Sequence, residues 1–282
     1  TTEIYTLSLH DALPILNAVC MASYNAARNY GIRRSGAIAP GYRADMVLFE
    51  DLKDFKPKDI FIAGDVYRDE PLPMPMVPKA VFGSVNIAPV GREQLALKVK
   101  GKMPVINLIE GQIVTKLSYE NVPEENGEFV SDGVFNKLAV IERHNATGHI
   151  GLGIVRGLNL KKGAIASTVA HDSHNIVVAG DNDGDMLLAV ETLKECGGGY
   201  AVVSRSVVLA RLPLPIAGLM TDAPIERVLA CQEALHDAAE SLGAGGVSDP
   251  LITLSFLALP VIPEARLTDI GMFDVINGKF IE

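Results

Sequence analysis

The stretch AIASTVAHDSHNIVVAGDNDGDMLLAVETLKECGGGYAVVS, residues 164–204, contains two short apolar runs, a helix-like segment and a third apolar run in succession. Residues 164–170 and 175–180 are predicted to be buried strands, because both runs are short, apolar and rich in β-branched residues. Residues 182–196 have the length and spacing of a helix, which the glycines at 197–199 are predicted to end. This mixture of strands and helices indicates an α+β domain.

Further elements are predicted on both sides of this stretch. A second amphipathic helix is predicted at 223–243, with Pro224 in its first turn and Gly243 at its end. The stretch 249–263 is apolar and interrupted by prolines, and no element is assigned to it. The remaining strands are predicted at 94–100, 104–117, 137–142, 150–157, 200–204 and 207–212.

A change of pattern near residue 71 predicts two parts. Before it, a helix is predicted at 16–30, with Gly31 at its end, and strands at 44–50 and 59–69. The segment 71–78, PLPMPMVP, contains four prolines and cannot continue a helix or a central strand. We therefore expect a proline-rich linker at 71–78 between a unit at 16–70 and a domain at 79–282.

The first fifteen residues, TTEIYTLSLHDALPI, show neither a helical nor a strand period. They resemble translated sequencing-adapter sequence. We expect residues 1–15 to be a non-native artefact and the biological sequence to begin near Leu16. His10 and Asp11 are therefore excluded from the candidate site.

The composition narrows the class of protein. With 282 residues and 48% hydrophobic residues, the chain can bury a substantial core. A formal net charge of −9 argues against nucleic acid as a partner, because phosphate backbones attract concentrated basic surfaces. No apolar run approaches the roughly 20 residues that span a membrane, so no membrane partner is expected. Three widely spaced cysteines and the lack of a secretory signal predict a cytoplasmic location.

The densest polar cluster is HDSHN, residues 171–175. His171 and His174 are candidate catalytic groups because imidazole exchanges protons near neutral pH, and Asp172 could orient one of them. Ser173 and Asn175 are the candidate substrate-binding residues. On a strand the two histidines would point to opposite faces, whereas on a tight turn they could converge. The alternative is structural: Asp172 and Ser173 make the hydrogen bonds of a turn, and the histidines fill polar holes.

The acidic run that follows resembles the start of a calcium-binding loop. Asp181, Asp183 and Asp185 have the required alternation, but Gly184 stands at position four instead of six, and Thr192 stands where a Glu is needed. Capping of the helix that follows is the favoured interpretation.

Three other groups of polar or glycine residues are weaker candidates. Glu142, Arg143 and His144 could line the same cleft as HDSHN, but a salt-bridged surface is favoured. His149 and His236 are predicted to be ordinary histidines, facing solvent or satisfied by neighbours. The glycines at 197–199 could admit a ligand close to the backbone, although the end of a helix explains them more simply.

Several longer stretches of the sequence resemble parts of known protein families. NAARNYGIRRSGAIAPGYRADMVLFEDLKDFKPKDIFIAGDVY (25–67) resembles the segment that closes many amidohydrolase-superfamily chains, although the superfamily often has Thr-x-Asn-Pro-Ala where residues 23–27 read SYNAA. The strings at 142–190, 209–222 and 249–275 resemble the C-terminal domain of bacterial adenine deaminases. The resemblance is collinear from about residue 16 to the end.

The resemblance implies a fold and a function. The fold would be the end of an amidohydrolase barrel with its small β-sandwich, followed by a C-terminal α+β domain. The activity would be hydrolysis of adenine to hypoxanthine and ammonia by water activated at a divalent metal, usually Mn²⁺, in a homo-oligomeric enzyme.

The His-x-His motif that starts the superfamily's metal site occurs nowhere in the sequence. We expect the metal ligands in a barrel upstream, and none in this chain. We also expect the chain alone to be inactive and prone to aggregate.

Two other functions stay open at this point. The complete protein could be another metal-dependent amidohydrolase, such as an amidase or a deacetylase. Alternatively, residues 79–282 could form an assembly module without a catalytic role.

Overall fold

The computed structural model describes residues 15–68, 76–244 and 249–281. The chain divides into two compact units, Thr1–Pro73 and Met74–Glu282, which are considered separately. Residues 1–14, and with them His10 and Asp11, lie outside the described residues, so the expected artefact stays a prediction; most of the proline-rich segment also lies outside them.

The first unit combines a short helical segment with a small antiparallel sheet. The predicted helix at 16–30 and the predicted strands at 44–50 and 59–69 are confirmed. Ala27 is the only residue that is buried among those described here, and an open apolar groove lies between helix and sheet. The elements are α2 (Ile15–Cys20), the π-helical turn η1 (Met21–Asn25), α3 (Ala26–Asn29), β1 (Met46–Phe49), β2 (Pro57–Ile62) and β3 (Asp65–Val66).

The second unit is built on an eight-stranded sheet with the order β13-β12-β10-β11-β8-β9-β4-β5. Neighbouring strands are antiparallel except for β4 and β9, which are parallel. The sheet together with its helices confirms the predicted α+β class. The strands are β4 (Met103–Leu108), β5 (Thr115–Glu120), β8 (Phe135–Ile141), β9 (Ile150–Arg156), β10 (Ala164–Ser167), β11 (Ile176–Gly180), β12 (Gly199–Ser204) and β13 (Val207–Pro213).

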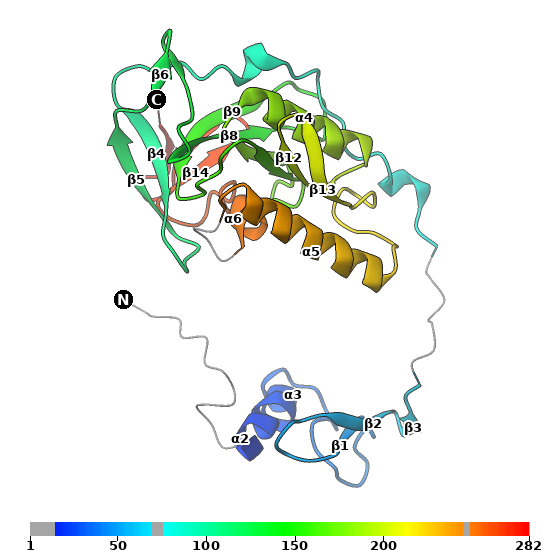
Figure 1. Ribbon diagram of the computed structural model, residues 1–282. Coiled ribbons are helices and arrows are strands. Elements are labelled where there is room, and N and C mark those ends of the chain that lie inside the picture. Colours follow the sequence, from blue (N-terminus) through cyan, green and yellow to red (C-terminus); the bar gives the residue numbers. More distant parts are fainter. Residues whose placement is uncertain (1–14, 69–75, 245–248, 282) are drawn as a thin grey trace. The chain divides into compact units, whose positions relative to one another are not determined.

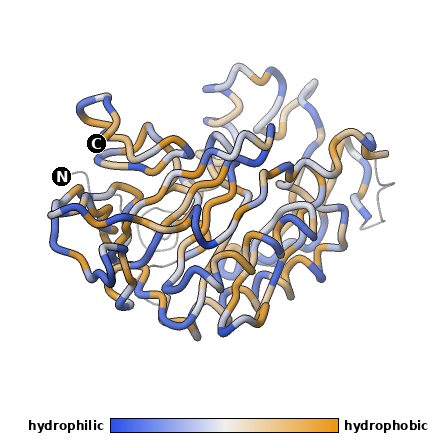
Figure 2. Tube along the Cα trace, turned by 90° about the horizontal axis from the view of Figure 1, so that it is seen from above, coloured by the Kyte–Doolittle hydropathy of each residue, from blue (hydrophilic) through white to orange (hydrophobic). Residues whose placement is uncertain are grey.

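Both faces of this sheet are covered (Figure 1). Helix α4 (Asp183–Glu195) packs on one face, while α5 (Ile225–Ser241) and α6 (Pro250–Phe256) pack on the other, beside a small sheet of β14 (Ala265–Thr268), β15 (Gly271–Asp274) and β16 (Lys279–Phe280). Successive residues of one strand enter the two cores in turn: Ala164 faces α4, and Ile165 faces α5 and α6. Figure 2 shows the apolar residues concentrated along the strands.

None of the helices within the described ranges is long and apolar enough to cross a membrane.

The acidic run at 181–185 organises the start of α4. Asn182 is the N-cap, and its side-chain oxygen accepts the N–H of Asp185 at 2.8 Å. Asp181 accepts the N–H of Gly163 at 2.8 Å, and Asp185 accepts the N–H of Ser206 at 2.7 Å. Nowhere in the described parts of the chain do three His, Cys, Asp or Glu side chains gather as metal ligands would. The Asn182 cap confirms the capping interpretation.

One predicted element needs correction, and one stretch left without a predicted element contains a helix. The strand predicted at 94–100 is wrong: Arg92–Leu95 form the 3₁₀ helix η3, and Lys98 alone makes a bridge, to Glu128. The segment stays mostly unpaired because its partner strand β7 (Glu128–Phe129), which forms a hairpin with β6 (Glu124–Glu125), has only two residues. The proline-interrupted stretch contains α6, whose N-cap Asp249 accepts the N–H groups of Leu251 and Ile252 at 2.9 Å each.

Glycines in β9 let the small C-terminal sheet approach the large sheet closely. A Cβ on Gly151 would lie 1.8 Å from the carbonyl oxygen of Thr268. A Cβ on Gly153 would lie 3.2 Å from the end of Met272, a flexible side chain. Gly151 is therefore the position at which the two sheets exclude any side chain.

We predict that Gly151→Ala destabilises the chain by about 3 kcal/mol or more, because the contact is with backbone that cannot move aside. Urea-induced unfolding of the 282-residue chain measures this. Gly184→Ala is the matched control: the nearest atom to its added Cβ is 3.4 Å away, and in α4 alanine should be neutral or gain up to about 1 kcal/mol. A Gly151→Ala chain as stable as Gly184→Ala would contradict the close approach.

Candidate functional site

The HDSHN loop, residues 171–175, joins β10 to β11 as a tight turn. The N–H of His174 donates to the carbonyl oxygen of Ala170 at 2.6 Å. The rings of His171 and His174 are brought together, with their centroids 6.4 Å apart. Of the two sequence-based geometries, the converging turn is the one observed.

The loop contains buried polar atoms without partners. His171 and His174 are half-buried, Asp172 and Ser173 are exposed, and Asn175 is buried. Nδ1 of His174 and Oδ1 of Asn175 have no hydrogen-bond partner within the described residues. A buried polar atom left unpaired costs free energy, so native proteins usually pair such atoms with protein, water or ligand. Two of the four such atoms among the described residues therefore lie in this loop.

Arg143 lies behind this loop and is almost completely buried, with 1% of its surface exposed. Its Nε–H donates to the carbonyl oxygen of His174. Nη1 donates to the carbonyl oxygen of Ser84 at 3.1 Å, and Nη2 donates to that of Ala217 at 3.2 Å. One guanidinium therefore connects the loop to two segments that are distant in sequence.

Glu142 is also buried, but its carboxylate binds the turn that follows β8. It accepts the N–H groups of His144, Asn145 and Thr147 at 2.6, 2.8 and 2.9 Å. Burial by itself would raise the pKa of Glu142, but these bonds and one from the Thr147 hydroxyl outweigh burial and lower that pKa to about 2. Glu142 is therefore ionised in the folded protein throughout the neutral range.

The favoured prediction for Glu142, Arg143 and His144, a salt-bridged surface, is wrong. Glu142 and Arg143 are buried and make their described hydrogen bonds to backbone and hydroxyl groups, not to each other. Exposed His144 contacts the HDSHN loop, with Nε2 lying 2.7 Å from the carbonyl oxygen of Ser173. The alternative, that the three residues line the same cleft as HDSHN, stays a prediction, although Arg143 and His144 both contact the loop.

Glycines allow segments to meet around the guanidinium. A Cβ on Gly218 would lie 2.8 Å from Nη1 of Arg143, and one on Gly198 would lie 2.5 Å from Cα of Gly218. The hydroxyl of Thr168 donates to the carbonyl oxygen of Gly218 at 2.6 Å. Residues 197–199 end α4 as predicted, since the N–H of Gly198 returns to Leu193 at 2.7 Å. Their lack of side chains also makes room beside Gly218.

The electrostatic surroundings favour neutral His174. Burial, the Arg143 guanidinium and His171 lower the pKa of His174 below its ordinary value, and Asp172 opposes the shift only in part. Near neutral pH the imidazole therefore has a free lone pair, which can accept a proton or a hydrogen bond.

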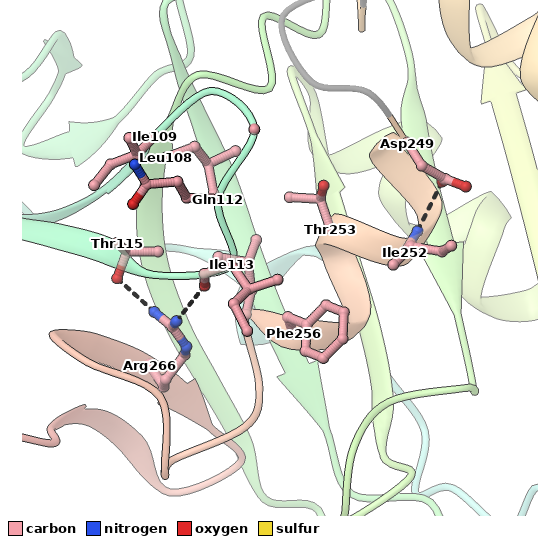
Figure 3. A pocket seen from close by; sticks show the side chains of 12 residues that line it. Leu108, Ile109, Gln112, Ile113, Thr115, Asp249, Ile252, Thr253, Phe256 and Arg266 are labelled. Carbon is pink, nitrogen blue, oxygen red and sulfur yellow. Dashed lines mark hydrogen bonds between the residues drawn. The ribbon is translucent and has the colours of Figure 1, made fainter. Parts of the chain in front are cut away.

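A cavity of about 130 Å³ adjoins the loop (Figure 3). Phe256 on α6 lines this cavity and also contacts the His171 ring, with the ring centroids 5.2 Å apart. Arg266 lies across the cavity and donates hydrogen bonds to Thr115 and to the carbonyl oxygen of Ile113. None of residues 171–175 lines the cavity, so it is a neighbour of the loop and not its continuation.

The remaining histidines with described surroundings are less enclosed. His149 and His236 have 57% and 48% of their side chains exposed, and they lie 3.7 Å from Asp269 and Asp249. Their assignment as ordinary solvent-facing histidines is confirmed.

Comparison with known proteins identifies the family. Residues 112–279, more than half of the chain, match the family described as the adenine deaminase C-terminal domain. The chain belongs to this family. Residues 3–67 match the amidohydrolase family.

Curated relatives of this adenine deaminase C-terminal domain chain agree with that assignment. The chain is 49% identical to "Adenine deaminase 2" of Carboxydothermus hydrogenoformans over 90% of its own length and 46% of the relative. It is 44% identical to "Adenine deaminase" of Desulfatibacillum aliphaticivorans over 97% of the chain and 49% of the relative. It is 42% identical to "Adenine deaminase" of Bacillus pumilus over 99% of the chain and 50% of the relative. The chain spans about half the length of the curated relatives it matches.

Sequence reasoning missed two residues of this adenine deaminase C-terminal domain. Arg143 was placed on the surface, and Phe256 was not considered. A charged residue directly after a buried apolar strand was the available indication for Arg143. For Phe256, the Asp-Pro pair at 249–250 could have indicated the start of a helix, although not its contact with His171.

We predict that Glu142→Gln lowers the free energy of unfolding by about 3 kcal/mol at pH 7, since the folded state strongly favours the carboxylate. With the folded pKa below the unfolded one, this stabilisation is complete above the ordinary Glu pKa and is lost as pH falls from 4.5 toward 2. Urea unfolding at several pH values should show the two chains converging at low pH. Glu240→Gln on exposed α5 is the control and should stay close to wild type. A Glu142→Gln difference that does not change with pH would contradict this assignment.

Proposed function

We propose that this chain is the C-terminal part of an adenine deaminase, which hydrolyses adenine to hypoxanthine and ammonia. The observation that carries the proposal is the family match over residues 112–279, and relatives with the printed name adenine deaminase support it. Among the described residues, the HDSHN loop offers the chemistry that best suits such a reaction, namely two converging imidazoles beside a carboxylate.

We also propose a domain assignment for the complete protein. Residues 16–70 would be the last barrel helix and the β-sandwich strands of an amidohydrolase, 71–78 a linker, and 79–282 the C-terminal domain. The match of residues 3–67 to the amidohydrolase family supports this, as do the short helix and the three antiparallel strands of the first unit.

The amidohydrolase match suggests a metal-dependent enzyme. The residues described here do not fit a metal site, since they contain no group of three His, Cys, Asp or Glu side chains placed to bind an ion. We propose that the metal, with Mn²⁺ as the candidate from the resemblance, is bound by residues outside this chain.

The reaction assigns roles to the loop. Water adds to C6 of the purine, and the amine leaves as ammonia after it receives a proton. We propose that His171 and His174 hold or transfer these protons, because one of them is kept neutral and both rings lie on the same turn. Asp172 would orient a neighbouring imidazole. The Ser173 hydroxyl and the Asn175 amide would contact the substrate.

The setting proposed for the complete protein is a cytoplasmic homo-oligomer that acts in purine salvage on a small molecule, with no nucleic acid or membrane as partner. The negative net charge and three free cysteines support this setting.

A second candidate function is an assembly module. Apolar side chains are exposed on α5, at Ile225 and Leu229, and on α6, at Ile252. Exposed apolar side chains suit contact with another domain or subunit.

The two candidates are separated by histidine variants of the complete protein. We predict that His171→Ala and His174→Ala each lower kcat/KM for adenine by about 100-fold, the usual lower range for a lost acid or base. His149→Ala and His236→Ala, which remove exposed histidines, are the controls and should retain activity. Ammonia release from adenine is the measurement.

Unchanged activity in His171→Ala and His174→Ala would favour the assembly module. A complete protein that releases no ammonia from adenine would contradict the proposed reaction itself. The 282-residue chain alone should show no turnover.

A further inference from the structure

Arg143 is a buried cation whose described hydrogen bonds all go to neutral oxygen atoms. Its three nitrogens donate to the carbonyl oxygens of His174, Ser84 and Ala217, and Nη1 also approaches the Ser84 hydroxyl at 3.3 Å. No carboxylate forms an ion pair with it within the described residues. A buried charge without an opposite charge is costly to fold, so its presence calls for a role that an apolar side chain could not serve.

We propose that Arg143 is the positioning residue of the HDSHN loop, and that it sets the direction of the His174 imidazole through the His174 carbonyl group. The functional purpose of this positioning rests on the proposed function, in which His174 takes part in deamination. The positioning itself can be tested without substrate.

The backbone that Arg143 binds is unusual at two places. His174 and Ala217 have φ angles of 52° and 57°, in the left-handed region that residues with a Cβ seldom adopt. Each is held there at a cost of about 1 kcal/mol or more, and the carbonyl oxygen of each accepts a guanidinium N–H. Arg143 therefore supports both backbone conformations, alongside the bonds that the N–H groups of His174 and Ala217 donate to Ala170 and Val81. For His174, the direction of Cα–Cβ follows from that conformation.

The guanidinium is itself fixed in place. Its plane lies against Gly218, where a Cβ would come 2.8 Å from Nη1 and 3.0 Å from Cζ. The acceptors Ser84 and Ala217 belong to different segments and bind different nitrogens, which matches the planar fork of Arg. Lys would retain the charge but, as a point charge on a flexible stem, could not hold three carbonyl groups in this arrangement.

The charge of Arg143 has a second effect on the same residue. Together with burial, it holds the pKa of His174 below the ordinary value. The other charged or titratable groups that act on this imidazole are His171 and His144, which lower the pKa further, and Asp172, which raises it. A single buried group thus influences both the orientation and the protonation of His174.

Histidine NMR titration of the isotopically labelled complete protein tests the positioning. In Arg143→Met the His174 pKa should rise toward its ordinary value, with a several-fold gain in proton affinity, because the positive charge beside the imidazole is lost. In Arg143→Lys the backbone signals of His174 and Asn175 should shift, because the charge is kept but the three carbonyl contacts are lost. Exposed His149 is the internal reference.

Arg266→Lys is the matched control. Arg266 is also fully buried and donates to four oxygen atoms, those of Thr115, Ala265, Ile113 and Pro263. We expect it to lower Tm about as much as Arg143→Lys while leaving the His174 titration and signals unchanged. If Arg143→Met does not fold, Arg143→Lys decides the test.

The proposal is overturned if His174 titrates and resonates as in wild type in the Arg143 variants, or if Arg266→Lys moves His174 equally. A separate measurement addresses the link to catalysis: in the complete protein, Arg143→Lys should lower kcat for adenine, change its pH profile and leave KM nearly unchanged. An inactive wild-type protein would contradict the proposed function, whereas the NMR result would still decide the positioning.

Discussion

The three carbonyl groups bound by Arg143 form the constraint on which this end of the sheet depends. They belong to the segments around residues 84, 174 and 217, which reach the same place from distant parts of the sequence. Carbonyl oxygens gathered in a buried space repel one another unless a donor lies between them. The guanidinium supplies that donor, and the HDSHN loop takes its shape from it.

Glu142 and Arg143 are adjacent charged residues that hydrogen-bond to backbone groups and do not pair with each other. The carboxylate binds backbone N–H groups in the turn after β8, and the guanidinium binds carbonyl oxygens on the far side. One residue therefore stabilises a turn that follows the strand, while the next stabilises the neighbouring loop. Each effect is lost when its own charge is replaced, so the two variants should fail differently: Glu142 affects stability at neutral pH, whereas Arg143 also affects His174.

Much of the second unit could be predicted from the sequence. The buried strands at 137–142, 150–157 and 175–180 were predictable because a strand covered on both faces is apolar along its length. The start of α4 was predictable because Asn182 is followed by a helical apolar pattern. Because these strands are apolar along their whole length, the sequence does not indicate which residues face which core. The order of the strands depends on pairing between distant segments, which a local pattern does not predict.

The candidate site was predictable only in part. HDSHN stands out because polar residues interrupt apolar runs, and a turn with converging histidines was among the expected geometries. Glu142 and Arg143 were placed on the surface because charged neighbours usually pair or face solvent. Their burial depends on backbone groups of other segments, and the contact of Phe256 with His171 depends on how α6 packs. Neither could be read from local sequence.

We propose that the HDSHN loop is the main contribution of this adenine deaminase C-terminal domain to the reaction of the complete protein. The most direct test is the structure of the complete protein with adenine or a stable analogue bound. We expect His171, Asp172 or His174 to lie within about 4 Å of the purine or of the water that attacks it, the distance of direct contact. A purine bound elsewhere, with the loop buried against another domain and remote from the ligand, would contradict a catalytic role for it.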